Sequence, residues 1–224
     1  MSNDLRWSPR SGFLDLAIPI EEPSWGIPRF TSGYSIGRRV LPSRFPTKTR
    51  YGEVALLNSL MRLEDWRELQ QFSGTERNLG RHHWNRSDAL RKGNVIVDLV
   101  AEVENFTVFR LQSIKPNLTE TDLFSWTKRK NAWLKHGTVD LASLGSSWPR
   151  VQGFVEVRNA LQHGLGELTD FQLSLAHRER VLAAVRSCSV HLDGGRVMLH
   201  PADVSRCADS CLTFISMLDC AAPE

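Results

Sequence analysis

One segment in the middle of the chain has apolar residues on nearly every side of a helix, and this pattern constrains the fold more than any other. The segment carries Val95, Ile96, Val97, Leu99, Val100, Val103, Phe106, Val108, Phe109 and Leu111. A helix without a polar face is normally buried, because no side of it favours contact with water. Ser87 is placed to begin this helix, which runs to about Ser113, and Pro116 closes it. We therefore expect a central helix surrounded by other elements.

Helical periodicity covers most of the chain from residue 51 onward. The expected helices span residues 53–72, 87–113, 122–136, 148–163, 169–187 and 201–220, with a polar break over 73–86. Residues 189–200 predict a β-hairpin with a tight turn at 193–195, and Pro201 opens the last helix. The predicted fold class is therefore mainly all-α: a helical bundle over residues 51–224 with a short β-hairpin before the last helix.

Residues 1–50 differ in composition from the rest of the chain. They hold most of the prolines and several glycines, which predicts an irregular, extended N-terminal arm. The second half of this arm is basic, with Arg38, Arg39, Arg44, Lys48 and Arg50. These cations could contact phosphate groups, although a solvated arm explains them more simply.

Charge and composition set only broad limits on function. The chain has 41% hydrophobic and 24% charged residues and a net charge of +3, which permits nucleic-acid binding without arguing for it. Neither a signal peptide nor an apolar run near the ~20 residues of a membrane span is visible, so we expect a cytoplasmic protein without membrane attachment. The four cysteines lack metal-ligand spacing and are expected to be buried thiols. We expect no metal ion and no other cofactor.

An arginine falls on the apolar side of the helix expected at residues 148–163. At about 100° per residue, Arg158 lies between Phe154 and Val155 on an apolar stripe. A buried charge without a partner costs several kcal/mol, so Arg158 requires compensation. Glu104 lies on an apolar side of the central helix and is one candidate partner. A pair of this kind could also be purely structural, tying two core helices together.

Two further polar residues follow Arg158 before the helix ends at Gly164. Asn159 and His163 share a helix face at i, i+4 spacing, where the amide could hydrogen-bond the imidazole. His163 lies about 140° around the helix from Arg158. Arg158 would therefore reach this face through its long side chain, or act with the corresponding residues of a second subunit.

The stretch Arg158-Asn159-Ala160-Leu161-Gln162-His163 resembles the R-x(4–6)-H motif of the HEPN superfamily (higher eukaryotes and prokaryotes nucleotide-binding domains). Members of this family are compact helical bundles. The segment 101–106, with its mid-helix glutamate, resembles the family's early helix, and the hairpin and last helix resemble those of several bacterial groups. The resemblance covers roughly residues 51–220.

The resemblance implies a metal-independent endoribonuclease, a homodimer whose two motif helices face one cleft. The ribose 2′-OH would attack the adjacent phosphate and leave a 2′,3′-cyclic phosphate, so DNA would survive. His163 would act as base or acid, and Arg158 would bind the phosphate. Asn159 would orient the imidazole or the substrate, and Glu104 would hold Arg158 or His163 in place. The family also implies a role in bacterial toxin–antitoxin or antiphage defence, with an antitoxin or defence-system protein as partner.

Two basic segments are candidate RNA contacts. Arg81, His82 and Arg86 lie in the polar break, and Lys128 and Arg129 lie on the helix expected at 122–136. An exposed polar connector and a solvated helix face explain the same residues without RNA.

Two other functions fit the sequence. One is a non-catalytic HEPN-like module that binds a nucleotide or a partner protein, with the polar trio in a structural role. The other is a scaffold or regulatory subunit whose basic arm, within residues 1–50, binds nucleic acid.

Overall fold

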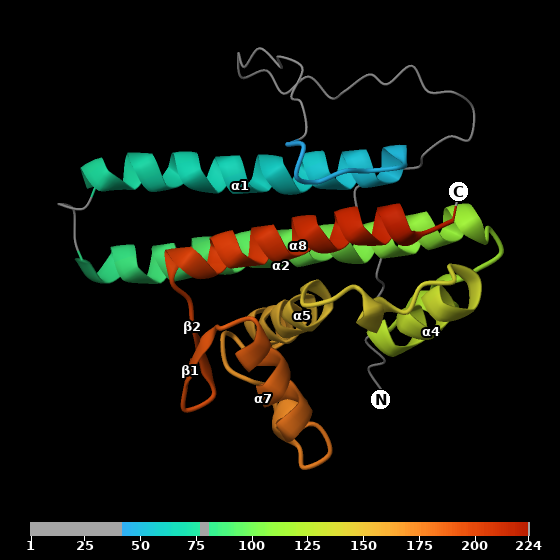
Figure 1. Ribbon diagram of the computed structural model, residues 1–224. Coiled ribbons are helices and arrows are strands. Elements are labelled where there is room, and N and C mark those ends of the chain that lie inside the picture. The colour runs from blue at the N-terminus through green and yellow to red at the C-terminus, as the bar shows by residue number, and fades with distance from the viewer. Residues whose placement is uncertain (1–41, 77–80, 224) are drawn as a thin grey trace, which may run out of the picture. The chain divides into compact units, whose positions relative to one another are not determined.

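A computed structural model describes the backbone of residues 42–76 and 81–223, and the side chains of the same ranges without residues 69 and 71–88 (Figure 1). Most of the expected arm, residues 1–41, therefore lies outside the described residues.

The elements of the described ranges follow one another as helices, interrupted by one hairpin. They are α1 (Arg50–Glu76), α2 (Arg81–Ile114), α3 (Glu120–Leu123), α4 (Trp126–His136), the 3₁₀ helix η1 (Leu141–Ser143), α5 (Ser147–His163), α6 (Asp170–Leu173), α7 (Arg178–Ser187), β1 (His191–Asp193), β2 (Arg196–Met198) and α8 (Pro201–Ala221). The prediction of a mainly helical fold with a hairpin before the last helix is confirmed.

The central position of the apolar helix is also confirmed. α1, α2 and α8 pack against one another, and α2 additionally contacts α4 and α5. Figure 1 shows α2 and α8 running side by side, with α1 along one side and α5 on the other. α5, which carries the R-x4-H motif and is called the motif helix below, also contacts α7. It therefore lies between the long helices α2 and α8 and the short helix α7.

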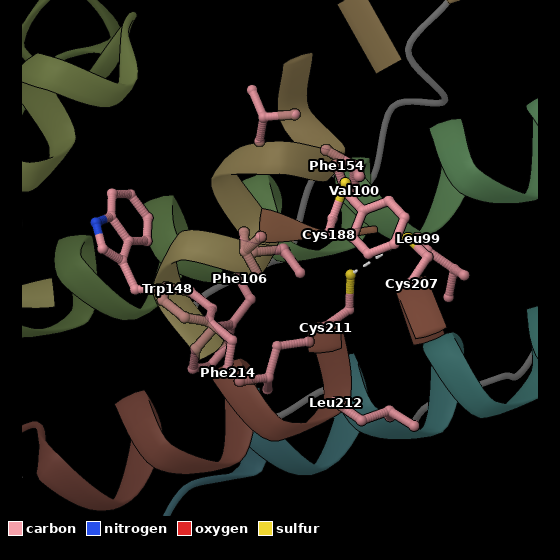
Figure 2. Close-up of a cluster of buried hydrophobic side chains, with 14 of the residues drawn as sticks. Leu99, Val100, Phe106, Trp148, Phe154, Cys188, Cys207, Cys211, Leu212 and Phe214 are labelled. Carbon is pink, nitrogen blue, oxygen red and sulfur yellow. Dashed lines mark hydrogen bonds between the residues drawn. The ribbon is translucent and has the colours of Figure 1, made fainter. Parts of the chain in front are cut away.

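The core forms where α2, α5 and α8 meet. Figure 2 shows Phe106, Trp148, Phe154 and Phe214 in this cluster, and each of them is buried. The rings of Trp148 and Phe214 stack with their centroids 5.7 Å apart. Aromatic rings in this arrangement fill much of the space between helices and add a little stability beyond their burial.

Three of the four cysteines belong to the same core, as expected. Cys188, Cys207 and Cys211 are buried, and Cys220 is half-buried. Burial raises the pKa of the Cys188 thiol to about 11 and raises that of Cys207 as well. These thiols stay protonated at neutral pH and pack as small apolar groups.

Helix boundaries differ from the prediction at the polar break. α1 continues to Glu76 and α2 begins at Arg81, so the expected break over 73–86 is wrong for most of its length. Charged residues have adequate helix propensity, and the end of apolar periodicity does not by itself end a helix.

Two of the expected helices are each divided in two. Thr119 caps α3, but the side chain of Ser125 accepts a hydrogen bond from the backbone N of Lys128 and begins α4 separately. Thr169 caps α6, which ends at Leu173, and α7 begins only at Arg178. Each break changes the direction of the chain. At the first a serine caps the new helix, and at the second a residue in the β region ends the preceding helix.

The hairpin has the predicted position and turn. Asp193 pairs with Arg196, and Leu192 pairs with Val197. Gly194 and Gly195 form the turn with φ of 57° and 101°. Positive φ at both central residues is the conformation that two-residue hairpin turns favour and that glycine adopts without strain.

Asp219 of α8 ties the segment before α1 to the helices. Its carboxylate accepts hydrogen bonds from the backbone N of Lys48 (2.7 Å) and Thr49 (2.9 Å), and from the Thr49 hydroxyl (2.5 Å). Arg110 of α2 donates its Nε–H to the same carboxylate at 3.3 Å, and the two side chains are 3% and 0% exposed. The last residues of the expected arm are thus anchored to the helical unit.

We predict that Asp219→Ala lowers the free energy of unfolding by about 3–5 kcal/mol, because it leaves the Arg110 charge buried without its partner. Urea denaturation followed by circular dichroism measures this loss. Asp209→Ala is the matched control, since the Arg44–Asp209 pair is 64% and 60% exposed and should contribute less than about 1 kcal/mol. Equal losses in the two variants would contradict the anchoring role of Asp219.

Candidate functional site

The motif helix α5 ends where the sequence predicts, at Gly164. The backbone N of Gly164 donates to the Ala160 carbonyl at 2.9 Å, and the following turn brings the Glu167 carbonyl against the α-carbon of Gly164. A Cβ at position 164 would lie 1.8 Å from that oxygen, which no side chain can occupy. Glycine is therefore required to end the helix directly after His163.

Arg158 is paired with Glu104, and this prediction is confirmed. Nη2 of Arg158 donates to Oε2 of Glu104 in a charge-assisted hydrogen bond between α5 and α2. The side chains are 18% and 17% exposed, so water screens the pair only weakly. The apolar stripe on α5 thus places a guanidinium at the edge of the core, where a carboxylate compensates its charge.

Two residues of α4 complete the surroundings of this carboxylate. Trp126 donates its indole N–H to Oε1 of Glu104 at 3.0 Å. Nη1 of Arg129 lies 3.6 Å from the same oxygen, and the side chain of Arg129 is 13% exposed. Glu104, Trp126, Arg129 and Arg158 are called the Glu104 cluster below.

The Glu104 cluster contains two cations and one anion. Burial lowers the pKa of the Arg129 guanidinium, the charge of Glu104 opposes this shift, and the charge of Arg158 adds to it. Arginine nevertheless stays protonated in proteins, so the cluster carries a formal excess of one positive charge. A partly desolvated positive excess at a surface attracts anionic groups.

Arg129 was expected as an RNA contact or as part of a solvated helix face, and the solvated face is wrong because its side chain is only 13% exposed. Arg129 precedes the buried residues Ala132 and Trp133 by three and four positions, so helical spacing places it on the inner face of α4. Its Nε–H donates to the Leu123 carbonyl at 2.7 Å, and its guanidinium lies 5.1 Å from the Trp126 ring centroid. The buried residues on either side of the Lys-Arg-Lys run were the signal that could have identified this position.

Asn159 has a different partner from the one expected. Its Oδ1 accepts a hydrogen bond from Nη1 of Arg158 at 3.0 Å. In the described part of the chain no hydrogen bond joins Asn159 to His163, so the expected amide–imidazole pair is wrong. The amide oxygen is engaged by the neighbouring arginine instead.

His163 is exposed at the last position of α5. Within one copy of the chain it makes no ion pair or hydrogen bond with Arg158 among the described residues. The structure therefore brings Glu104, Arg158 and Asn159 together, and His163 does not contact Arg158, in keeping with their ~140° separation around the helix.

The other expected RNA contacts are only partly described. Lys128 is exposed on α4 and donates its Nζ to the Thr121 carbonyl at 2.8 Å. Arg81, His82 and Arg86 fall in the first turns of α2, and their side chains lie outside the described residues.

The two glutamates of the central helix have separate surroundings. Glu102 faces α1, where Nδ2 of Asn58 donates to its Oε1 at 2.9 Å, whereas Glu104 faces α4 and α5. Burial raises the pKa of Glu102, and the Asn58 hydrogen bond and the charge of Arg62 only partly offset that rise. Glu104 is thus the glutamate at the motif helix.

A second buried carboxylate on α5 was not anticipated from the sequence. Glu156 accepts hydrogen bonds from Nε2 of Gln172 at 2.9 Å and from Nη1 of Arg180 at 3.1 Å. It lies between Val155 and Val157 in an apolar run, the same signal that drew attention to Glu104. This contact fixes α6 and α7 to α5 and so supports the end of the motif helix.

The described residues hold no group of three or more histidine, cysteine or acidic side chains that could bind a metal ion. Over the same part of the chain, no helix is both long and apolar enough to span a membrane. Comparisons with protein-family models, with curated proteins and with solved structures gave no match to the chain.

We predict that Glu102→Gln stabilises the protein at pH 7 and changes its stability little at pH 4. A carboxyl group whose pKa is raised in the folded state destabilises the fold progressively as pH rises from the ordinary pKa of 4.5 through the raised pKa. Glutamine keeps the contact with Asn58 and removes the buried charge. Urea denaturation at the two pH values measures the difference, with the exposed Glu120→Gln as control. Equal effects at both pH values would contradict the raised pKa.

Proposed function

We propose that the chain is a HEPN-type, metal-independent endoribonuclease. The observation that carries this proposal is the arrangement of its R-x4-H motif, with Arg158 held by a half-buried carboxylate and His163 exposed at the end of the same helix. Arg158 has five N–H donors. One donates to Glu104 and one to Asn159, and the remaining N–H groups can donate to a phosphate oxygen. A guanidinium held in this way is already oriented before a ligand binds.

The proposed reaction needs a base, an acid and a cation at one phosphate. His163 removes the proton of a ribose 2′-OH, and that oxygen attacks the adjacent phosphorus as the bond to the 5′-oxygen breaks. A protonated imidazole returns a proton to the leaving 5′-oxygen. Arg158 stabilises the additional negative charge on the phosphorane, and the products are a 2′,3′-cyclic phosphate and a 5′-hydroxyl. Glu104 and Asn159 position Arg158.

A homodimer supplies the geometry that one copy lacks. Because Arg158 and His163 point to different sides of α5, the Arg158 of one copy and the His163 of the other would share a cleft between two motif helices. Lys128, exposed on α4, would contact the RNA backbone outside that cleft. The family resemblance further suggests a cytoplasmic protein of bacterial toxin–antitoxin or antiphage defence, held by an antitoxin or defence-system partner.

A second candidate is a non-catalytic HEPN-like module that binds a nucleotide or a protein. It is favoured by the contacts of Arg158, which Glu104 and Asn159 already engage, and by the lack of any contact between Arg158 and His163 among the described residues. In this case Arg158 contributes to stability alone.

The first function predicts cleavage of RNA by the purified protein in EDTA, with loss of at least about 10²-fold in rate in Arg158→Ala and in His163→Ala, because base and phosphate contact are removed. Gel analysis of a labelled RNA measures the rate, and the fragments should carry 2′,3′-cyclic phosphates. The same oligonucleotide made as DNA should remain intact.

His191→Ala is the matched control, since His191 is an exposed histidine on β1 and belongs neither to the motif nor to α5. Its rate should equal that of the unchanged protein. Cleavage that persists in both motif variants rejects the assigned residues. Intact RNA with every variant, together with a lower melting temperature for Arg158→Ala alone, favours the non-catalytic module.

A further inference from the structure

The Glu104 cluster has one donor more than its carboxylate satisfies. Nη1 of Arg129 is buried and has no hydrogen-bond acceptor among the described residues. It lies 3.6 Å from Oε1 of Glu104, beyond the 2.7–3.2 Å range of a hydrogen bond, while Trp126 donates to that oxygen at 3.0 Å. A small movement of the carboxylate toward α4 would satisfy this donor.

The two arginines of the cluster are held with different firmness. Arg129 is fixed by its bond to the Leu123 carbonyl and by the Trp126 ring, and the bond to Leu123 does not involve Glu104. Arg158 has Glu104 and the amide of its neighbour Asn159, and its side chain is slightly more exposed, at 18% against 13%. Arg158 is therefore the guanidinium that can turn outward.

Turning Arg158 outward is costly only if Glu104 is left without a cation. A carboxylate shielded from water that loses its single cationic partner destabilises the folded state strongly. Here Arg129 remains beside the carboxylate with an unused N–H. Departure of Arg158 would also remove the repulsion between the two guanidinium groups.

We propose that Glu104 is exchanged between the two arginines: Arg129 takes over the carboxylate when the Arg158 guanidinium moves to an external oxyanion such as a phosphate group. Arg129 is then a positioning residue, which balances the charge of Glu104 after Arg158 has left and so makes Arg158 available to a ligand. The exchange itself follows from the cluster, and the identity of the oxyanion as an RNA phosphate rests on the proposed function.

A double-variant cycle in urea denaturation tests the exchange without RNA. Arg129→Met and Arg158→Met should each lower the folding equilibrium constant modestly, because the remaining arginine still balances Glu104. The double variant should lower it about tenfold more than the product of the single effects. In a Glu104→Gln background this extra loss should disappear.

Lys135→Met combined with Arg158→Met is the matched control, because Lys135 is an exposed cation on the same helix as Arg129. That pair should show no extra loss. If Arg129→Met and Arg158→Met combine as simple products, or if Arg158→Met alone is as damaging as the double variant, the exchange is overturned.

Inorganic phosphate tests the ligand half of the proposal. The indole N–H of Trp126, which contacts Glu104, should shift saturably in ¹H–¹⁵N spectra as phosphate is added, and sodium chloride of equal ionic strength should not reproduce the shift. Arg158→Met should abolish the response, and Arg129→Met should weaken phosphate binding about tenfold.

No response to phosphate in the unchanged protein overturns the oxyanion half and leaves the exchange to the urea cycle. Neither measurement uses RNA. A protein that cleaves no RNA but shows coupling and phosphate binding would therefore refute the proposed function and retain the exchange. Additive variants in an active ribonuclease would refute the exchange and retain the proposed function.

Discussion

A single carboxylate on the central helix determines how the motif helix is presented. Glu104 of α2 is bound by Arg158 from α5 and by Trp126 from α4, with Arg129 of α4 close by. A half-buried glutamate needs partners, and those partners come from two other helices, α4 and α5. The position of α4 against α2, the orientation of Arg158 and the positive excess of the cluster all depend on it.

The sequence predicted the parts of this arrangement that follow from helical periodicity. Arg158 on an apolar stripe and Glu104 on an apolar helix each required a partner, and burial made them partners of one another. Periodicity could not show that Ser125 starts a new helix, because that break depends on one capping hydrogen bond. Once α4 is separate, its inner face carries Arg129 and Trp126 to Glu104, a long-range contact that no local pattern specifies.

The prediction for Asn159 and His163 failed for a related reason. Spacing at i, i+4 allows two side chains to meet, but the amide oxygen of the asparagine accepts a hydrogen bond from the neighbouring arginine. His163 is left exposed beside the turn that Gly164 makes possible. The same helical geometry that places Arg158 at the edge of the core turns His163 away from it, and the proposed ribonuclease site therefore uses a second copy of the chain.

Mixing two inactive variants tests this central claim most directly. In a dimer of one Arg158→Ala copy and one His163→Ala copy, the intact His163 and the intact Arg158 belong to different chains and can share one cleft. RNA cleavage should be absent from each variant alone and should return when the two are unfolded and refolded together. If chains pair at random, half of the dimers are mixed, and each mixed dimer has one intact site of two. The expected rate is therefore about a quarter of that of the unchanged protein. A mixture that stays inactive while each variant is folded and dimeric would contradict a site shared between copies.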